Sequence, residues 1–172
     1  MSLLSLDAVN TFIEQFHILE GVTFEVPAGE ICVLVGPSGC GKTTLLDLLM
    51  RLQRPDGGQV HFRGCELKAY RRSELARAMA LDPEVLFFDE PSAGLDPISA
   101  SLLDELILEL RDSLGATIIV VTHELASIFA IGNNSVYLDP DKKTMTAAGD
   151  PKKLLAETRD PELRRFLTRG KG

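Results

Sequence analysis

Three short runs of apolar residues divide the chain, and each one ends in polar residues. Residues 31–35 are entirely apolar, residues 85–88 are apolar up to an acidic pair, and residues 116–122 are rich in β-branched side chains. Such runs, bounded by turn-forming residues, are typical of strands buried on both faces. Apolar residues recur at helical spacing after residue 42 and over residues 98–113. Strands that alternate with helices predict an α/β fold with a mostly parallel, doubly wound sheet.

Outside these runs the pattern predicts smaller elements. Alternation of apolar and polar positions predicts two N-terminal strands that form an antiparallel β element, at residues 1–10 and 21–26. Phe12 and Phe16 lie between these strands. Each ring could either stack on an adenine or pack in the core, and the sequence does not decide between these two roles. The remaining expected elements are strands at 59–62, 135–138 and 144–148, helices at 73–81 and 124–131, and a tail at 150–172 with two short helices opened by proline.

The helix expected over residues 98–113 is amphipathic. Its spacing assigns five side chains to the core face, namely Leu102, Leu103, Leu106, Ile107 and Leu110. Asp96-Pro97 precedes this helix and Gly115 follows it, which are typical start and stop signals.

Composition narrows the classes of function. The 172 residues suffice for one domain, and 45% of them are hydrophobic. A net charge of −7 argues against nucleic-acid binding. No apolar run has the length of a membrane span, and residues 1–20 lack a signal-peptide pattern, so any membrane association is expected through a partner. Cys32, Cys40 and Cys65 are odd in number and lack metal-ligand spacing, which predicts reduced cytosolic thiols.

The strand at 31–35 leads into the chain's most specific motif. Residues 36–43 fit the phosphate-loop pattern G-x-x-x-x-G-K-[ST] at every fixed position, between an expected strand and an expected helix. Glycines let the backbone turn its N–H groups toward phosphate oxygens, and the helix adds its positive end. Lys42 would reach the β- and γ-phosphates, and the Thr43 hydroxyl would bind Mg²⁺. The predicted nucleotide-binding residues are Gly36, Pro37, Ser38, Gly39, Cys40, Gly41, Lys42, Thr43 and Thr44. Two interpretations of Cys40 remain: a reactive thiol, or an inert residue that fills space in the tight loop.

Two further strand ends carry candidate catalytic residues. The strand at 85–88 runs into Asp89 and Glu90, at the edge where parallel strands of such sheets meet their ligand. Asp89 is expected to hold Mg²⁺ together with water, and Glu90 to act as general base or to position the attacking water. His123 ends the strand at 116–122 and is expected beside the phosphates. We therefore predict Lys42, Glu90 and His123 as catalytic residues, with Thr43 and Asp89 as metal ligands.

Taken in order, these motifs resemble those of ATP-binding cassette (ABC) transporter ATPases. Residues 36–43 resemble Walker A, residues 87–91 Walker B, residues 92–96 the D-loop and residues 122–123 the switch histidine. The resemblance implies ATP hydrolysis between two such domains, a second ATPase subunit in a homodimer, and coupling to transmembrane permease subunits. It implies a γ-phosphate contact for His123 and a cross-dimer contact for Asp96. Residues 160–167 and 94–98 look most like the ATPases of MCE/Mla-type phospholipid-trafficking importers.

The chain departs from that family between its two Walker motifs. Lys42 and Asp89 are 47 positions apart, much closer than the family places them. The helical subdomain, the Gln loop and the signature motif belong in this interval, and the sequence has no Ser-Gly-Gly. An internal gap is therefore expected near residues 68–73. Either the molecule lacks the subdomain or the printed sequence omits it, and loss of the dimer chemistry in a natural enzyme favours omission.

The resemblance and the residues together predict a single ABC-type P-loop NTPase domain over residues 1–172. The expected function is Mg²⁺-dependent ATP binding and hydrolysis that powers transport, with lipid or another hydrophobic solute as the narrower expectation. The expected location is cytoplasmic, peripheral on the inner face of the cell membrane, and no nucleic-acid partner is expected. A module that binds ATP without turnover and a non-transport P-loop ATPase or kinase remain as alternatives.

Overall fold

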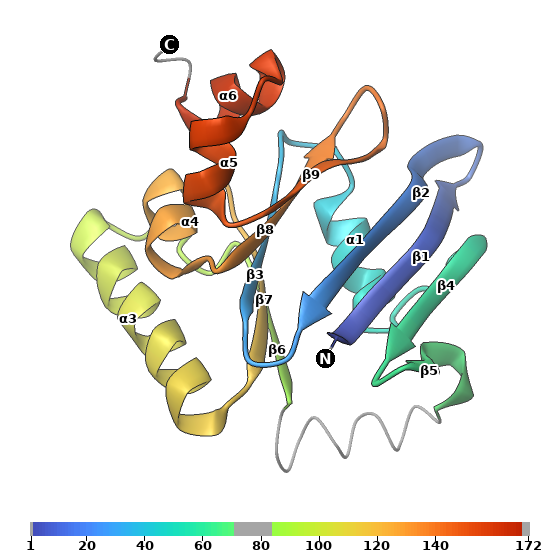
Figure 1. The fold of residues 1–172 in the computed structure, drawn as a ribbon, viewed down its shortest axis with the longest axis horizontal. Coiled ribbons are helices and arrows are strands. Elements are labelled where there is room, and N and C mark those ends of the chain that lie inside the picture. Colours follow the sequence, from blue (N-terminus) through green and yellow to red (C-terminus); the bar gives the residue numbers. More distant parts are fainter. Residues whose placement is uncertain (1, 71–83, 170–172) are drawn as a thin grey trace.

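The computed structural model describes residues 2–70 and 84–169, and these form two sheets (Figure 1). The N-terminal sheet is antiparallel and has the order β2-β1-β4-β5. Its strands are β1 (Ser2–Ile13), β2 (Phe16–Pro27), β4 (Gly57–Phe62) and β5 (Cys65–Glu66), followed by a 3₁₀ turn, η1 (Leu67–Ala69). The expected N-terminal antiparallel element is confirmed.

The second sheet has the order β6-β7-β3-β8-β9 and is parallel except at β9. Its strands are β3 (Ile31–Val35), β6 (Val85–Asp89), β7 (Thr117–Val121), β8 (Asn134–Asp139) and β9 (Thr144–Gly149). β3 lies at its centre and is completely buried, as a strand covered on both faces must be. The predicted α/β class with a mostly parallel sheet is correct.

Helices cover both faces of the parallel sheet. Helix α1 (Lys42–Leu49) lies on the face toward the antiparallel sheet, and its leucines share a core with β1, β2 and β4 (Figure 1). The opposite face is covered by α3 (Pro97–Leu114), α4 (Leu125–Ile131), α5 (Pro151–Glu157) and α6 (Pro161–Leu167). The two cores meet across β3, so residues 32 and 34 face one core and residues 31, 33 and 35 the other.

Several boundaries differ from the sequence expectation. Strands β1 and β2 are longer than predicted and pair up to Ile13 and Phe16, so Phe12 and Phe16 lie within the hairpin strands. The polar stretch after Phe62 forms β5 and η1, where the sequence predicted no element. The helix expected over residues 73–81 lies outside the described residues.

The expected core face of α3 is partly wrong. Ile107 is buried, but Leu102 and Leu106 are 60% and 49% exposed. The buried side of the helix is instead completed by a polar residue, Asp104, which is only 9% exposed. Spacing alone could not reveal this rotation, because leucines occupy more than one side of the helix.

The tail forms the two predicted helices. Asp150 and Asp160 cap α5 and α6 by accepting backbone N–H bonds, and proline occupies the first turn of each. Leu163 and Leu167 of α6 are buried in the core beneath β8. Within residues 2–70 and 84–169, no helix combines the length and the apolar character that crossing a bilayer requires.

Candidate functional site

The loop between β3 and α1 depends on glycine at two positions. Gly36 has φ +149°, and a Cβ there would lie 2.5 Å from the carbonyl oxygen of Leu138. Gly41 has φ +97° and ends the loop directly before α1, where a Cβ would lie 2.8 Å from Leu19. Any side chain would therefore both strain the backbone and displace its neighbours. The predicted role of glycine in shaping this loop has a direct steric basis in the structure.

Lys42 folds back over the loop that it follows. Its Nζ atom donates hydrogen bonds to the carbonyl oxygens of Gly36 and Pro37, each at 2.8 Å. The ammonium group therefore sits inside the curve of the loop with its full positive charge, and loop carbonyls occupy two of its three N–H donors. A triphosphate needs this combination, because its charge is dense and its oxygens only accept hydrogen bonds at neutral pH.

A pocket of about 360 Å³ opens in front of this loop. It brings together residues 38–39 and 41–44 of the phosphate loop with the carboxyl ends of β6 and β7, which are far apart in the sequence. Its lining consists of Ile13, Ile18, Ser38, Gly39, Gly41, Lys42, Thr43, Thr44, Asp89, Glu90 and Val121. Thr43 and Asp89, the two predicted metal ligands, thus line one pocket. A hydroxyl, a carboxylate and nearby phosphate oxygens suit Mg²⁺, which keeps several waters and needs few protein ligands.

Glu90 and His123 form a contact that the sequence did not predict. The imidazole Nδ1 lies 2.9 Å and 3.0 Å from the two carboxylate oxygens of Glu90. Glu90 also has a left-handed backbone, φ 47°, which is held by a 2.8 Å hydrogen bond from its N–H to the carbonyl of Val121. Strained backbone of this kind costs of order 1–3 kcal/mol and concentrates at functional sites. Two of the three predicted catalytic residues are therefore in contact, with Glu90 in the pocket lining and His123 beside it.

Not every predicted nucleotide-binding residue faces the pocket. Gly36, Pro37 and Cys40 are not among the residues that line it. The Cys40 thiol is 2% exposed, and burial raises its pKa although Lys42 nearby opposes the shift. A buried thiol that resists ionisation is a poor nucleophile, so the structure favours the packing role for Cys40 over the reactive one.

Phe12 and Phe16, whose role the sequence left undecided, take different positions. Phe12 stacks face to face on His17, with ring centroids 4.2 Å apart and planes 8° apart, and remains 48% exposed. Phe16 is 60% exposed, so neither ring belongs to the core. Ile13, next to Phe12, lines the pocket. The sequence analysis did not single out His17. Its stacking on Phe12 depends on the register that pairs the two residues in the β-hairpin.

Asp96 has a local role at the start of α3. Its carboxylate accepts hydrogen bonds from the N–H groups of Ile98 and Ser99 and from the Ser99 hydroxyl at 2.6 Å. These bonds hold the pKa of Asp96 below its usual value. The cross-dimer contact that the family resemblance implies for Asp96 stays a prediction.

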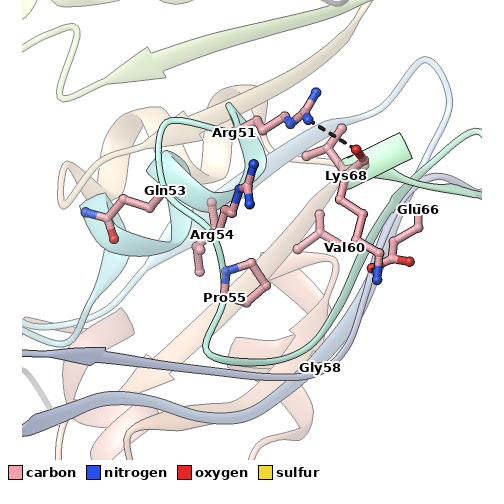
Figure 2. A pocket seen from close by; sticks show the side chains of 10 residues that line it. Arg51, Gln53, Arg54, Pro55, Gly58, Val60, Glu66 and Lys68 are labelled. Atoms are coloured by element: carbon pink, nitrogen blue, oxygen red, sulfur yellow. Dashed lines mark hydrogen bonds and ion pairs between the residues drawn. The ribbon is translucent and has the colours of Figure 1, made fainter. Parts of the chain in front are cut away.

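A separate pocket lies beyond the end of α1 (Figure 2). Its volume is about 170 Å³, and basic side chains from the loop after α1 and from η1 surround it, namely Arg51, Arg54 and Lys68. Arg51 donates a 3.2 Å hydrogen bond to the carbonyl of Lys68, the dashed line in Figure 2, and a second bond to the carbonyl of Tyr70. This pocket shares no lining residue with the phosphate-loop pocket, and it adjoins the point where the gap was expected.

Comparisons with known proteins agree with this geometry. Residues 19–74 match the family profile described as "ABC transporter". The chain is similar to the intermembrane phospholipid transport system ATP-binding protein MlaF of Escherichia coli K12, at 28% identity over 87% of this chain and 82% of MlaF. It is also similar to the L-cystine import ATP-binding protein TcyN of Bacillus subtilis, at 27% identity over 89% and 88%. Among solved structures, cbiO1 of Clostridium perfringens, part of the ABC transporter complex cbiONQ, superposes with a TM-score of 0.79 over 91% of each chain at 20% identity.

These similarities give the chain the fold of an ABC ATPase, a P-loop NTPase, and residues 19–74 resemble the ATP-binding domain of an ABC transporter. Identities of 27% and 28% to proteins named for different substrates do not fix a subfamily. The alignment with MlaF covers 225 positions but only 87% of the 172 residues here, about 150, so about 75 positions have no residue of this chain opposite them. The profile match ends at residue 74, close to the expected gap.

Proposed function

We propose that this ABC-type ATP-binding domain binds Mg²⁺·ATP in the pocket between the phosphate loop and the ends of β6 and β7. The observation that carries the proposal is the convergence of Lys42, Thr43, Asp89 and Glu90 on one pocket lining. Lys42 would exchange its bonds to loop carbonyls for bonds to phosphate oxygens, at little cost in conformational entropy because the side chain is already in place. Thr43 and Asp89 would hold Mg²⁺, which supplies charge neutralisation for the phosphates.

Glu90 and His123 would act on the terminal phosphate. With the nucleotide bound, the Glu90 carboxylate would accept a proton from the attacking water, and His123 would donate a hydrogen bond to a γ-phosphate oxygen. Their 2.9 Å contact supports this division of roles, because a base and its orienting partner must lie within hydrogen-bond reach. The face of Phe12 that is not stacked on His17 is the proposed adenine platform.

The biological role that fits best is energy coupling to transport. We propose that the chain works with transmembrane permease subunits and a second ATPase subunit, peripheral on the inner face of the cell membrane. The similarity to MlaF supports a lipid or other hydrophobic substrate, and the similarity to TcyN supports a different one. We therefore propose coupling to transport in general and, more specifically, transport of a hydrophobic solute.

A second function follows from the missing alignment positions. A chain without the signature motif has the half-site that holds phosphate but lacks the half that closes over the partner's nucleotide. Such a chain would serve as a nucleotide-binding module with little or no turnover. About 75 positions of the MlaF alignment have no residue of this chain opposite them, and this favours the second candidate for the 172-residue chain itself.

Titration with a fluorescent ATP analogue in the presence of Mg²⁺ tests the binding proposal. Lys42→Ala should abolish tight binding, because Lys42 supplies the full positive charge of the phosphate loop and also bridges two of its carbonyls. Lys153→Ala removes the same charge from exposed helix α5 and is the matched control. Unchanged affinity in a folded Lys42→Ala protein would remove Lys42 from the site and with it the proposed function.

A further inference from the structure

The C-terminal end of the described chain touches the residue that follows the switch histidine. Arg169 Nη2 lies 3.0 Å from Glu124 Oε2, and Glu124 Oε1 lies 3.8 Å from His123 Nε2. The other ring nitrogen of His123 contacts Glu90. The imidazole therefore lies between two carboxylates, and the guanidinium of Arg169 neutralises the outer one.

Arg169 is held in place by a packed helix. Leu163 and Leu167 of α6 are 1% and 3% exposed, and the Phe166 ring lies 5.6 Å from the ring of Tyr137 in β8. The backbone N–H of Arg169 donates a 3.2 Å hydrogen bond to the carbonyl of Phe166, which ends the helix against this anchor. The fold of the tail thus places the backbone of Arg169 within reach of Glu124, although the Arg169 side chain is largely exposed.

We propose that Arg169 is a positioning residue for the γ-phosphate contact, acting through Glu124 on His123; the inference rests on the proposed function. Glu124 would repel the terminal phosphate if its charge were uncompensated, and it would be free to draw the imidazole away from Glu90. Arg169 offsets this charge and fixes the carboxylate at 3.0 Å. The tail helix α6 thereby takes part in the nucleotide site without touching the nucleotide.

This arrangement makes a specific prediction about nucleotide preference. ADP lacks the γ-phosphate, so its affinity should be insensitive to the charge beside His123. Arg169→Ala should therefore weaken ATP binding relative to ADP binding, by about two- to five-fold, the range of effects that exposed ion pairs show. A merely structural role of Arg169 would lower both affinities together.

The experiment measures dissociation constants for Mg²⁺·ATP and Mg²⁺·ADP with the full 172-residue chain. Arg169→Lys should keep most of the ATP preference, because it keeps the charge. Arg165→Ala removes the same charge from α6, and no ion pair of Arg165 is found in residues 2–70 and 84–169, so it should leave the preference unchanged. Glu124→Gln combined with Arg169→Ala should restore the preference, because the uncompensated carboxylate is then gone.

A second measurement keeps this inference separate from the proposed function. The chain has three histidines, and their ring signals can be resolved by NMR without nucleotide. Arg169→Ala should shift the ring signals of His123 and leave those of His17 and His61 in place. Absence of ATP binding by the parent chain would overturn the proposed function, while unmoved His123 signals, or equal losses for ATP and ADP, would overturn the role of Arg169.

Discussion

At the end of β6, one residue combines a strained backbone with a candidate catalytic side chain. Glu90 keeps φ 47° because its N–H bonds the neighbouring strand, and this conformation turns its carboxylate to His123 at the pocket edge. A standard strand conformation at residue 90 would direct the side chain elsewhere. The backbone strain is therefore consistent with a functional requirement at this residue.

Replacement of Glu90 by glutamine should separate binding from chemistry. Glu90→Gln keeps the shape of the side chain and a hydrogen-bonding group but removes the base. Affinity for Mg²⁺·ATP should survive, while any phosphate release that the parent shows should fall by about 10²–10⁴-fold. Single-turnover phosphate release at high protein concentration is the measurement, with His123→Ala expected to act similarly. Hydrolysis by Glu90→Gln at the parent rate would place the base elsewhere.

The three thiols should differ in reactivity. Burial raises the pKa of Cys40 and raises that of Cys32 to about 12, so both stay protonated at neutral pH, whereas Cys65 is exposed. Because the thiolate is the reactive form, a maleimide should label Cys65 first and Cys40 slowly. Mass spectrometry of peptides after timed labelling, with and without Mg²⁺·ATP, checks this order. Rapid labelling of Cys40 that nucleotide prevents would restore the alternative of a reactive loop thiol.

At the scale of elements, the sequence predicts helices and strands best where one hydrophobic period or one motif is compatible with a single structure. The strand–loop–helix unit around residues 31–49 was predicted because its glycines, lysine and apolar run all require the same geometry. The orientation of α3 was not, because Leu102 and Leu106 satisfy the helical period as well as Ile107 does. What decides the orientation is contact with α4, which is a tertiary property.

The buried acid of α3 offers a test of that orientation. Burial raises the pKa of Asp104, and a hydrogen bond from Ser127 of α4 offsets part of the shift. A carboxyl group with a raised folded-state pKa binds protons more readily in the folded protein, so it costs stability at neutral pH and this cost vanishes as the pH falls through that pKa. Asp104→Asn should therefore stabilise the protein at pH 7 by about 0.5–2 kcal/mol.

Chemical denaturation at a series of pH values measures this effect. The difference in unfolding free energy between Asp104→Asn and the parent should shrink as the pH is lowered into the acid range. Glu105→Gln, one residue along on the exposed side of α3, is the control and should show little effect at any pH. A destabilising Asp104→Asn would mean that the carboxylate has a favourable partner in the folded protein.

For the whole molecule, the sequence motifs predicted the site but could not predict how its parts contact one another. Walker-type motifs identified Lys42, Asp89 and Glu90, and the structure lines one pocket with them. The contact of Glu90 with His123, and of Glu124 with Arg169, joins segments 33 and 45 residues apart that carry no shared pattern. Such contacts depend on how strands and helices pack, which no local signal encodes.

The chain also passes from η1 toward β6 without the interval that its relatives have. Tyr70, the last described residue before 71–83, is tied down by the Arg51 guanidinium and by its own hydroxyl, which donates to the carbonyl of Phe62 at 3.2 Å. Of the residues where the internal gap was expected, 68 and 69 belong to η1 and Tyr70 follows them, while residues 71–73 lie outside the described residues. On the proposed function, the described part would supply the half-site for phosphate and Mg²⁺, and residues 2–70 and 84–169 contain no Ser-Gly-Gly signature to close over a second copy's nucleotide.

We accordingly predict that a protein made as these 172 residues binds Mg²⁺·ATP, remains a monomer when ATP is added, and turns over little or none. Light scattering with and without Mg²⁺·ATP measures the oligomeric state, and Glu90→Gln in parallel prevents turnover from reversing any association. An intact mass of 18.8 kDa would show that the interval is missing from the molecule itself. ATP-dependent dimers at that mass would show that two half-sites can close without a signature motif. A larger mass would instead place the helical subdomain in the molecule, and dimers would then be expected.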